Sequence, residues 1–299
     1  MKKLVCIVLM LVMVFSLGAC VDISDTGTDK IPTDGASTPS VGDSSVQQPA
    51  QALTIAESVI FEQNGIKVTV KGLETTGLFG PSVKILIENN SAQNITVQAR
   101  DSSVNGVMID TLFSEDVAVG KKANGTITFS STQLKAASIN TLKDIEFSLH
   151  IFDSDSWDTI VDTNPICLTT SADASFVQTY DDSGFVAYNE GGIKVVVKKL
   201  SSEDSFWGSE VYLYIENNTT QNITVQVRDV SIDGFMVDPI FSCDIVGGKK
   251  AFDSITFLAS DLTDNGLTDI KELELKLHIF NADTWNNIHD SDIIKIAFN

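Results

Sequence analysis

The sequence predicts an all-β protein made of two tandem antiparallel β-sandwiches. The chain repeats itself with a shift of about 128 residues: IENN at 87–90 returns at 215–218, QNITVQ at 93–98 returns at 221–226, and LHIF at 149–152 returns at 277–280. Because this period exceeds the roughly 20–50 residues of solenoid repeats, it indicates two whole domains. Within each copy, short segments alternate between apolar and polar residues, and no long segment has the 3.6-residue period of a helix.

The N-terminus predicts export from the cytoplasm. Lys2 and Lys3 precede an apolar run over residues 4–17, which is short for a membrane span and has the proportions of a secretory signal. The run ends in LGAC at residues 17–20, which resembles the bacterial lipobox. The resemblance implies that residues 1–19 are a lipoprotein signal peptide and that acyl chains such as palmitate are attached to Cys20. An ordinary cleaved signal peptide followed by a chance cysteine is the alternative.

Residues 20–57 are expected to be the lipidated cysteine and a disordered tether. Ser, Thr, Asp, Gly, Pro and Gln dominate this segment, so it cannot bury enough apolar surface to offset the entropy of ordering. Flexible-coil scaling gives the tether a reach of roughly 30–35 Å. A shorter break at 171–184 is the predicted linker between the first domain, residues 58–170, and the second, residues 185–299.

Alternating apolar residues define the expected strands of the first copy. They lie over residues 66–70, 83–87, 95–99, 107–119, 126–129, 145–151, 157–161 and 166–170. Asn105-Gly106, matched by Asp233-Gly234, favours a two-residue hairpin, because such a turn needs positive φ angles. One helical turn is expected over residues 131–135 and another over 260–262.

The pattern of these motifs resembles the Ig-like domains of Gram-positive surface lipoproteins. A strand that ends in Glu-Asn-Asn-Ser/Thr, a second strand, and Gly-Lys-Lys before Ile-Thr-Phe carry the resemblance, which covers nearly all of residues 58–170 and 185–299. Many of these domains are uncharacterised, and some are grouped with immunoprotective-antigen-like sandwiches. The resemblance implies an Ig-like β-sandwich at the cell surface and no reaction. The paired core cysteines of disulfide-bonded Ig domains are absent from this sequence.

Net charge limits the possible partners, and the positions of the cysteines limit the possible disulfide bonds. The net charge of −20 becomes −22 once Lys2 and Lys3 leave with the signal peptide, so nucleic acid, which needs a basic surface, is excluded. The charge leaves cationic proteins, neutral glycans and surfaces bridged by divalent cations as partners, and solubility alone would also explain it. Cys167 and Cys243 occupy non-equivalent positions in the two copies, which excludes a bridge repeated in both domains. A single disulfide bond between Cys167 and Cys243, which would join the two domains, remains an alternative.

No residue pattern predicts catalysis, a cofactor or a metal centre. His150 and His278 share the polar face of their strands with one glutamate each and are expected to be solvated, since zinc needs three or four ligands. Neither a Ser-His-Asp arrangement nor a glycine-rich phosphate loop is present, so we expect no enzyme. The Asp-rich loop at 153–158, repeated with Asn substitutions at 281–286, is interpreted either as a Ca²⁺ site or as turn-forming residues.

Aromatic residues are the candidates for partner binding. Trp157 and Trp285 lie in those loops, where each could stack on a sugar ring, anchor a protein, or plug the end of its sandwich. The second copy adds Phe206, Trp207, Tyr212 and Tyr214, which favour either recognition or a contact between the domains.

A row of polar residues is identical in the two copies. Thr96, Gln98 and Arg100 return unchanged 128 residues later. A shared binding face, a recent duplication, or an ion pair between Arg100 and Asp116 would each explain it.

The function that these features favour is a membrane-anchored extracellular lipoprotein that acts as a non-catalytic binding or adhesion module. The lipid would hold it on the extracellular face of the cell membrane, and its ligand would be a protein or a glycan. The alternative is a structural or accessory envelope protein that spaces or holds another membrane protein. The sequence does not determine the oligomeric state.

Overall fold

The computed structural model describes residues 53–201, 208–267 and 270–298. The predicted signal peptide, Cys20, most of the tether, and Phe206 and Trp207 lie outside the described residues. The last part of the expected tether, residues 53–57, contacts the first repeat instead of standing free. Thr54 N donates to Ser171 Oγ at 2.9 Å, Ser171 N donates to Thr54 O at 2.8 Å, and Ile55 packs against the hydrophobic core.

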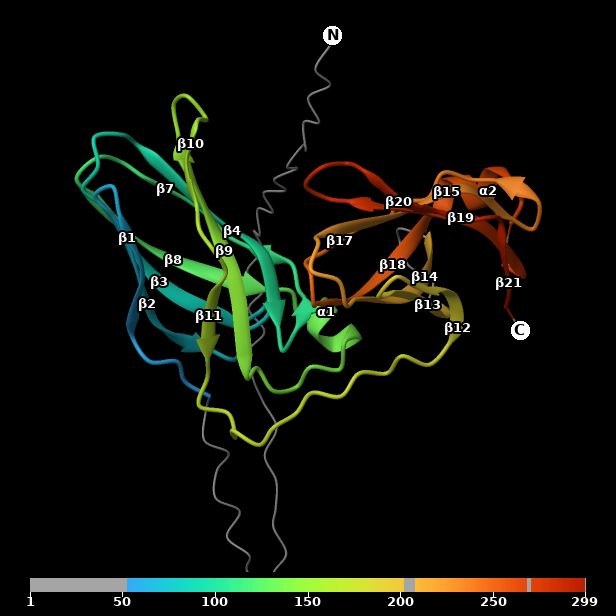
Figure 1. The fold of residues 1–299 in the computed structure, drawn as a ribbon, viewed down its shortest axis with the longest axis horizontal. Helices are drawn as coiled ribbons and strands as arrows, with labels where there is room; N and C mark the ends of the chain where they lie inside the picture. Colours follow the sequence, from blue (N-terminus) through green and yellow to red (C-terminus); the bar gives the residue numbers. More distant parts are fainter. Residues whose placement is uncertain (1–52, 202–207, 268–269, 299) are drawn as a thin grey trace, which may run out of the picture. The chain divides into compact units, whose positions relative to one another are not determined.

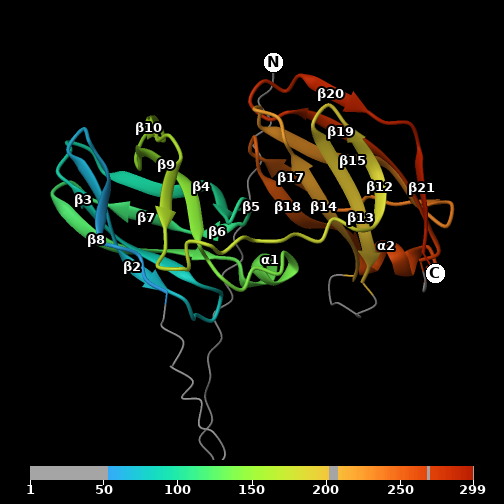
Figure 2. The same ribbon diagram turned by 60° about the horizontal axis from the view of Figure 1, so that its bottom comes forward.

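The first repeat is an antiparallel β-sandwich, as predicted (Figures 1 and 2). One sheet has the order β1-β2-β3-β8-β6, and in the other β9 pairs with β4, β10 and β11, while β4 also pairs with β5 and β7. Its strands are β1 (Ser58–Gln63), β2 (Ile66–Glu74), β3 (Ser82–Asn89), β4 (Ile95–Val104), β5 (Val107–Met108), β6 (Thr111–Leu112), β7 (Ser114–Val117), β8 (Lys121–Phe129), β9 (Asp144–Asp153), β10 (Thr159–Asp162) and β11 (Ile166–Thr169). The expected helical turn is α1 (Ser131–Ala136).

The second repeat has the same strand pairing, except that an isolated bridge between Ile240 and Thr256 takes the place of the β6–β8 pair. β12-β13-β14-β18 form one sheet layer, and in the other β19 pairs with β15, β20 and β21, while β15 also pairs with β16 and β17. The strands are β12 (Phe185–Glu190), β13 (Ile193–Leu200), β14 (Gly208–Asn217), β15 (Ile223–Ile232), β16 (Phe235–Met236), β17 (Ser242–Ile245), β18 (Lys250–Leu258), β19 (Glu272–Asn281), β20 (Asn287–Asp290) and β21 (Ile294–Ala297). The second helical turn is α2 (Ala259–Asp264). A single parallel bridge pairs Val107 of β5 with Lys250 of β18.

Each repeat has its own hydrophobic core. In β9, the alternating residues Ile145, Phe147, Leu149 and Ile151 are buried, and β19 repeats this pattern. Because side chains of a strand alternate between the two faces of its sheet, this alternation places one face of β9 on the core. The strand pattern that predicted the fold is therefore the pattern that builds the core.

Two-residue hairpins with positive φ angles set the register of the strands. The predicted one joins β4 to β5, with φ of 51° at Asn105 and 82° at Gly106. The structure also contains one that the sequence analysis missed, between β1 and β2, with φ of 53° at Asn64 and 78° at Gly65. The strand β1 was missed with it, although Asn-Gly before an alternating strand is the established signal for such a turn.

Both cysteines that the structure describes are unpaired. Cys167 is exposed on β11, and Cys243 is buried on β17, so the bridge that the sequence left open is not formed. Within residues 53–298, apart from the two short gaps, we find no helix of the length and apolarity that a membrane crossing requires.

Candidate functional site: the tryptophan loops

The two loops that carry Trp157 and Trp285 form the candidate site. We call residues 153–158 and 281–286 the tryptophan loops. In the first, Asp153 Oδ1 accepts hydrogen bonds from the N–H groups of Asp155 (2.8 Å) and Ser156 (3.0 Å), and Trp157 N donates to Asp153 O at 2.9 Å. These backbone donors lower the pKa of Asp153. The aspartate thus folds the loop back onto itself.

The second tryptophan loop has the same hydrogen bonds around an asparagine. Asn281 Oδ1 accepts from the N–H groups of Asp283 (3.0 Å) and Thr284 (2.8 Å), and Trp285 N donates to Asn281 O at 2.8 Å. Either Asp or Asn can supply this side-chain oxygen, which explains why the first residue of the loop differs between the copies. The geometry supports the turn-forming interpretation of these residues. Among the residues described here, no three His, Cys, Asp or Glu side chains group as metal ligands would.

Both tryptophans point outward. Trp157 is 74 % exposed and Trp285 is 77 % exposed, so neither plugs the end of its sandwich. Their backbones have φ of 66° and 62°, in the left-handed region that costs an L-residue roughly 1–2 kcal/mol. Among the described residues, each repeat therefore has one exposed indole on a strained backbone.

The ring of a phenylalanine stacks against each indole. The ring of Trp157 stacks on Phe152, with centroids 5.5 Å apart and planes 18° apart, and Trp285 stacks on Phe280 at 5.5 Å and 16°. Phe152 follows the buried Ile151, so it lies on the outer face of β9, where alternation would place a polar residue. This role of Phe152 was not predicted, although the interrupted alternation of β9 was a signal for it.

A histidine and an aspartate extend each stack. His150 Nδ1 and Asp162 Oδ1 lie 2.5 Å apart, because the two residues are directly opposite each other on β9 and β10. The His150 ring is tilted against Phe152, with centroids 5.1 Å apart. The expectation of a solvated histidine is thus wrong, since only 12 % of the His150 side chain is exposed. β10 and Phe152 pack against His150 and shield its side chain from solvent.

The second copy repeats this arrangement. His278 Nδ1 lies 2.6 Å from Asp290 Oδ1, and its ring centroid lies 5.0 Å from that of Phe280. The hydrogen bond from the histidine lowers the pKa of Asp290. Each repeat therefore presents an Asp–His–Phe–Trp array that ends in an exposed indole.

Side-chain hydrogen bonds hold the polar row on β4. Thr96 Oγ1 donates to Asp116 Oδ1 at 2.6 Å, and Arg100 Nη2 donates to Gln98 Oε1 at 3.4 Å. An ion pair between Arg100 and Asp116, one of the three explanations considered for the row, is not formed. Asp116 of β7 lies directly opposite Thr96, so its carboxylate accepts a hydrogen bond from the threonine instead of pairing with Arg100.

Tyr212 and Tyr214, the remaining aromatic candidates that the structure describes, make their contacts within the second repeat. Tyr214 is only 2 % exposed, its ring is tilted against Phe252 at 5.1 Å, and burial raises the pKa of its hydroxyl. Tyr212 Oη donates to Glu210 Oε2 at 2.9 Å. The buried Tyr214 is thus not offered to a partner, and Phe206 and Trp207 lie outside the described residues.

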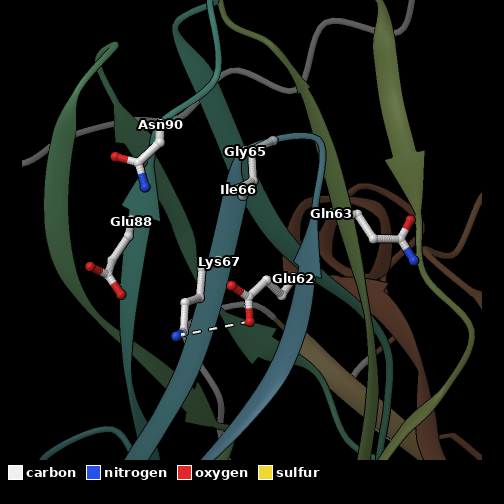
Figure 3. A pocket seen from close by; sticks show the side chains of 7 residues that line it. All are labelled: Glu62, Gln63, Gly65, Ile66, Lys67, Glu88 and Asn90. Atoms are coloured by element: carbon white, nitrogen blue, oxygen red, sulfur yellow. Dashed lines mark ion pairs between the residues drawn. The ribbon is translucent and has the colours of Figure 1, made fainter.

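A surface hollow at the β1–β2 hairpin has different chemistry (Figure 3). Lys67 Nζ lies 3.9 Å from Glu62 Oε2 there, and Glu88 pairs with Lys122, which lowers the pKa of Glu88. Its lining residues are Glu62, Gln63, Gly65, Ile66, Lys67, Glu88 and Asn90. The charges of this hollow are paired, and the strand position that matches Glu62 is Asn189 in the second repeat.

Comparison with known proteins adds little to this geometry. No protein family matches the chain, and no curated protein matches it. Among solved structures, the chain is similar to the YadV chaperone, with 12 % identity and a TM-score of 0.23, over 73 % of this chain and 92 % of that one. It is also similar to the Salmonella enterica SafA pilin in complex with the SafB chaperone, with 9 % identity and a TM-score of 0.24, over 80 % of this chain and 98 % of that one. At these TM-scores the likenesses carry no argument about function.

Proposed function

We propose that this chain is an extracellular lipoprotein, anchored in the cell membrane through Cys20, that binds a ligand through its tryptophan loops and catalyses no reaction. The observation that carries the proposal is the outward indole of Trp157 and Trp285, held on the same array in both repeats. Burying a large apolar side chain stabilises a protein by roughly 1.5–3 kcal/mol, and both copies forgo most of this gain. Both also keep the backbone strain.

Divergence between the copies supports this proposal. Ser154, Ser156 and Asp158 of the first tryptophan loop are replaced by Ala282, Thr284 and Asn286 in the second. The Asp, His, Phe and Trp of the array are the same in both. Packing explains why the buried Phe and the mostly covered His are retained, but Trp157 and Trp285 are largely exposed and are retained as well, so the tryptophan is the part that a shared function would maintain.

The membrane anchor is part of the same proposal. It rests on LGAC at residues 17–20, after a short apolar run with two N-terminal lysines. Several acyl chains on Cys20 would hold the protein firmly, because one chain alone binds membranes only marginally. The Ser- and Thr-rich segment that follows would place the tryptophan loops away from the lipid surface.

The test is a ligand screen with a matched pair of variants. The chain is applied to arrays of glycans and of extracellular proteins, as wild type, as Trp157→Ala/Trp285→Ala, and as the control Phe79→Ala. Phe79 is 66 % exposed but lies in the β2–β3 loop, outside the array. We expect at least one ligand that wild type and Phe79→Ala retain and that the double variant loses by tenfold or more in affinity.

Two results would contradict the proposal. One is the absence of any ligand above background, and the other is binding that the double variant retains unchanged. Crosslinking in intact cells completes the test. One dominant envelope partner, held equally by wild type and by the double variant, would favour the structural or accessory role instead.

A further inference from the structure

We infer that the two tryptophan loops are equivalent sites for a neutral sugar ring, so that one chain binds two ligands. This inference rests on the proposed function, since it names the ligand class of the same loops. It draws on three features of the loops: one free aromatic face, a polar surround, and a charge that differs between the copies.

The indole offers one face to a ligand. Phe152 stacks on Trp157 and Phe280 stacks on Trp285, while about three quarters of each tryptophan remains exposed. The stack fixes the ring orientation in advance, so a ligand would not have to order the side chain on binding. A flat, pre-oriented apolar face suits the C–H face of a pyranose ring, which is itself flat and apolar.

Polar groups surround each indole. Beside Trp157, Ser156 Oγ donates to Asp158 Oδ2 at 3.0 Å, and Asn94 Nδ2 donates to Asp155 Oδ2 at 3.2 Å. A sugar ring has hydroxyl groups around its apolar face, and these need such hydrogen-bonding partners. In a protein–protein interface, by contrast, charged residues are depleted around the buried aromatic anchors, and water is excluded from them. The polar surround therefore favours a sugar over a protein surface.

The charge of the loops differs between the copies. The first tryptophan loop contains Asp153, Asp155 and Asp158, whereas Asp283 is the single carboxylate of the second. A cationic ligand would depend on these carboxylates, and an anionic ligand would be repelled by them and by the net charge of −20. The aromatic array is the same in both copies although the charge of the loop differs. This combination favours a neutral ligand.

Isothermal titration calorimetry tests this inference. The probes are neutral oligosaccharides of four or more units, built from glucose, N-acetylglucosamine, galactose, mannose or xylose. The protein is the full chain in detergent, with residues 50–299 as a second preparation, because this stretch forms one compact unit. We expect two sites per chain for at least one probe in wild type and in the control Phe79→Ala.

The variants separate the two sites. Trp157→Ala and Trp285→Ala should each leave one site, whose Kd changes less than twofold, and the double variant should leave none. Asp155→Asn/Asp158→Asn should change the affinity of the first site by less than tenfold. Raising NaCl from 0.1 to 0.5 M should also have little effect, since salt screens charge interactions but not stacking.

Three outcomes would overturn the inference. The first is no tryptophan-dependent heat with any of the probes, and the second is one site per chain that survives either single substitution. The third is binding that 0.5 M NaCl abolishes, which would indicate a charged ligand. If a protein on the array binds through the tryptophans while every sugar fails, the sugar inference is wrong and the proposed function stands. If neither ligand class depends on the tryptophans, both are wrong.

Discussion

Asn89 and its counterpart Asn217 are fully buried polar residues whose side chains are completely hydrogen-bonded. Asn89 Nδ2 donates to Gln93 O and Val117 O, each at 2.8 Å, and Asn89 Oδ1 accepts from Ser91 N at 3.0 Å and Ser91 Oγ at 2.6 Å. The side chain thus ties the end of β3 to the following turn and to β7. This explains the Glu-Asn-Asn-Ser/Thr motif that recurs in the sequence.

We expect Asn89→Ala to lower the free energy of unfolding by roughly 2–4 kcal/mol, since buried backbone groups left unsatisfied cost about 1–3 kcal/mol each. The control is Asn90→Ala, because the neighbouring asparagine is exposed and should change stability by less than about 0.5 kcal/mol. Urea unfolding followed by circular dichroism measures both. Equal effects of the two substitutions would show that the buried hydrogen bonds do not stabilise the turn.

In the two tryptophan loops, the identity of the candidate residues was predictable from the sequence, but their exposure was not. The sequence identified Trp157 and Trp285 as candidates, but their exposure depended on whether the loop closes over the core. Hydrogen bonds of Asp153 and Asn281 turn each loop outward, and stacking on Phe152 and Phe280 holds the indoles there. These contacts depend on the pairing of β9 with β10, which residue types alone do not specify.

At the scale of elements, Gly80 marks a close approach between the segment before β3 and the end of β8. Its φ is +138°, and a Cβ added there would lie 2.0 Å from Phe129 O. Gly208 has the same role in the second repeat, with φ of +121° and 1.9 Å to Phe257 O. Phe129 N also donates to Pro81 O at 2.9 Å, so the two segments are held together at this point.

Gly80→Ala should lower the free energy of unfolding by at least about 3 kcal/mol, because backbone strain and overlap with a carbonyl act together. Gly120→Ala is the matched control. Its φ of +69° is also positive, but nothing lies within 4 Å of an added Cβ, so the cost should be only about 1–2 kcal/mol. Thermal and urea unfolding would reveal the difference. If both variants lost the same stability, the close approach would not matter.

The elements themselves were largely predictable. Alternation located the buried strands, and Asn105-Gly106 located a hairpin, because both signals are local. β1 was missed, since its alternation is weak and only Phe61 among its residues is buried. β1 forms because the Asn64-Gly65 turn brings it alongside β2, with which it pairs.

At the scale of the whole molecule, the membrane anchor is the part of the proposed function that is simplest to test. Wild-type protein should fractionate with membranes and have a mature N-terminus at Cys20 that carries acyl mass, whereas Cys20→Ser should lose both properties. Fractionation with mass spectrometry of the N-terminal peptide makes the measurement. Cys167→Ser, which removes an exposed free thiol, should behave as wild type. A membrane-bound Cys20→Ser protein would contradict the anchor.

The sequence by itself determined the duplication, the all-β class, most strands and one hairpin of each repeat. Each of these follows from a period or a local turn preference that adjacent residues encode. Only the tertiary structure decided that Tyr214 is buried, that Asp116 bonds Thr96 rather than Arg100, and that His150 is covered beside Asp162. These outcomes depend on which side chains strand pairing places opposite one another across long sequence separations. Local patterns carry no record of that pairing.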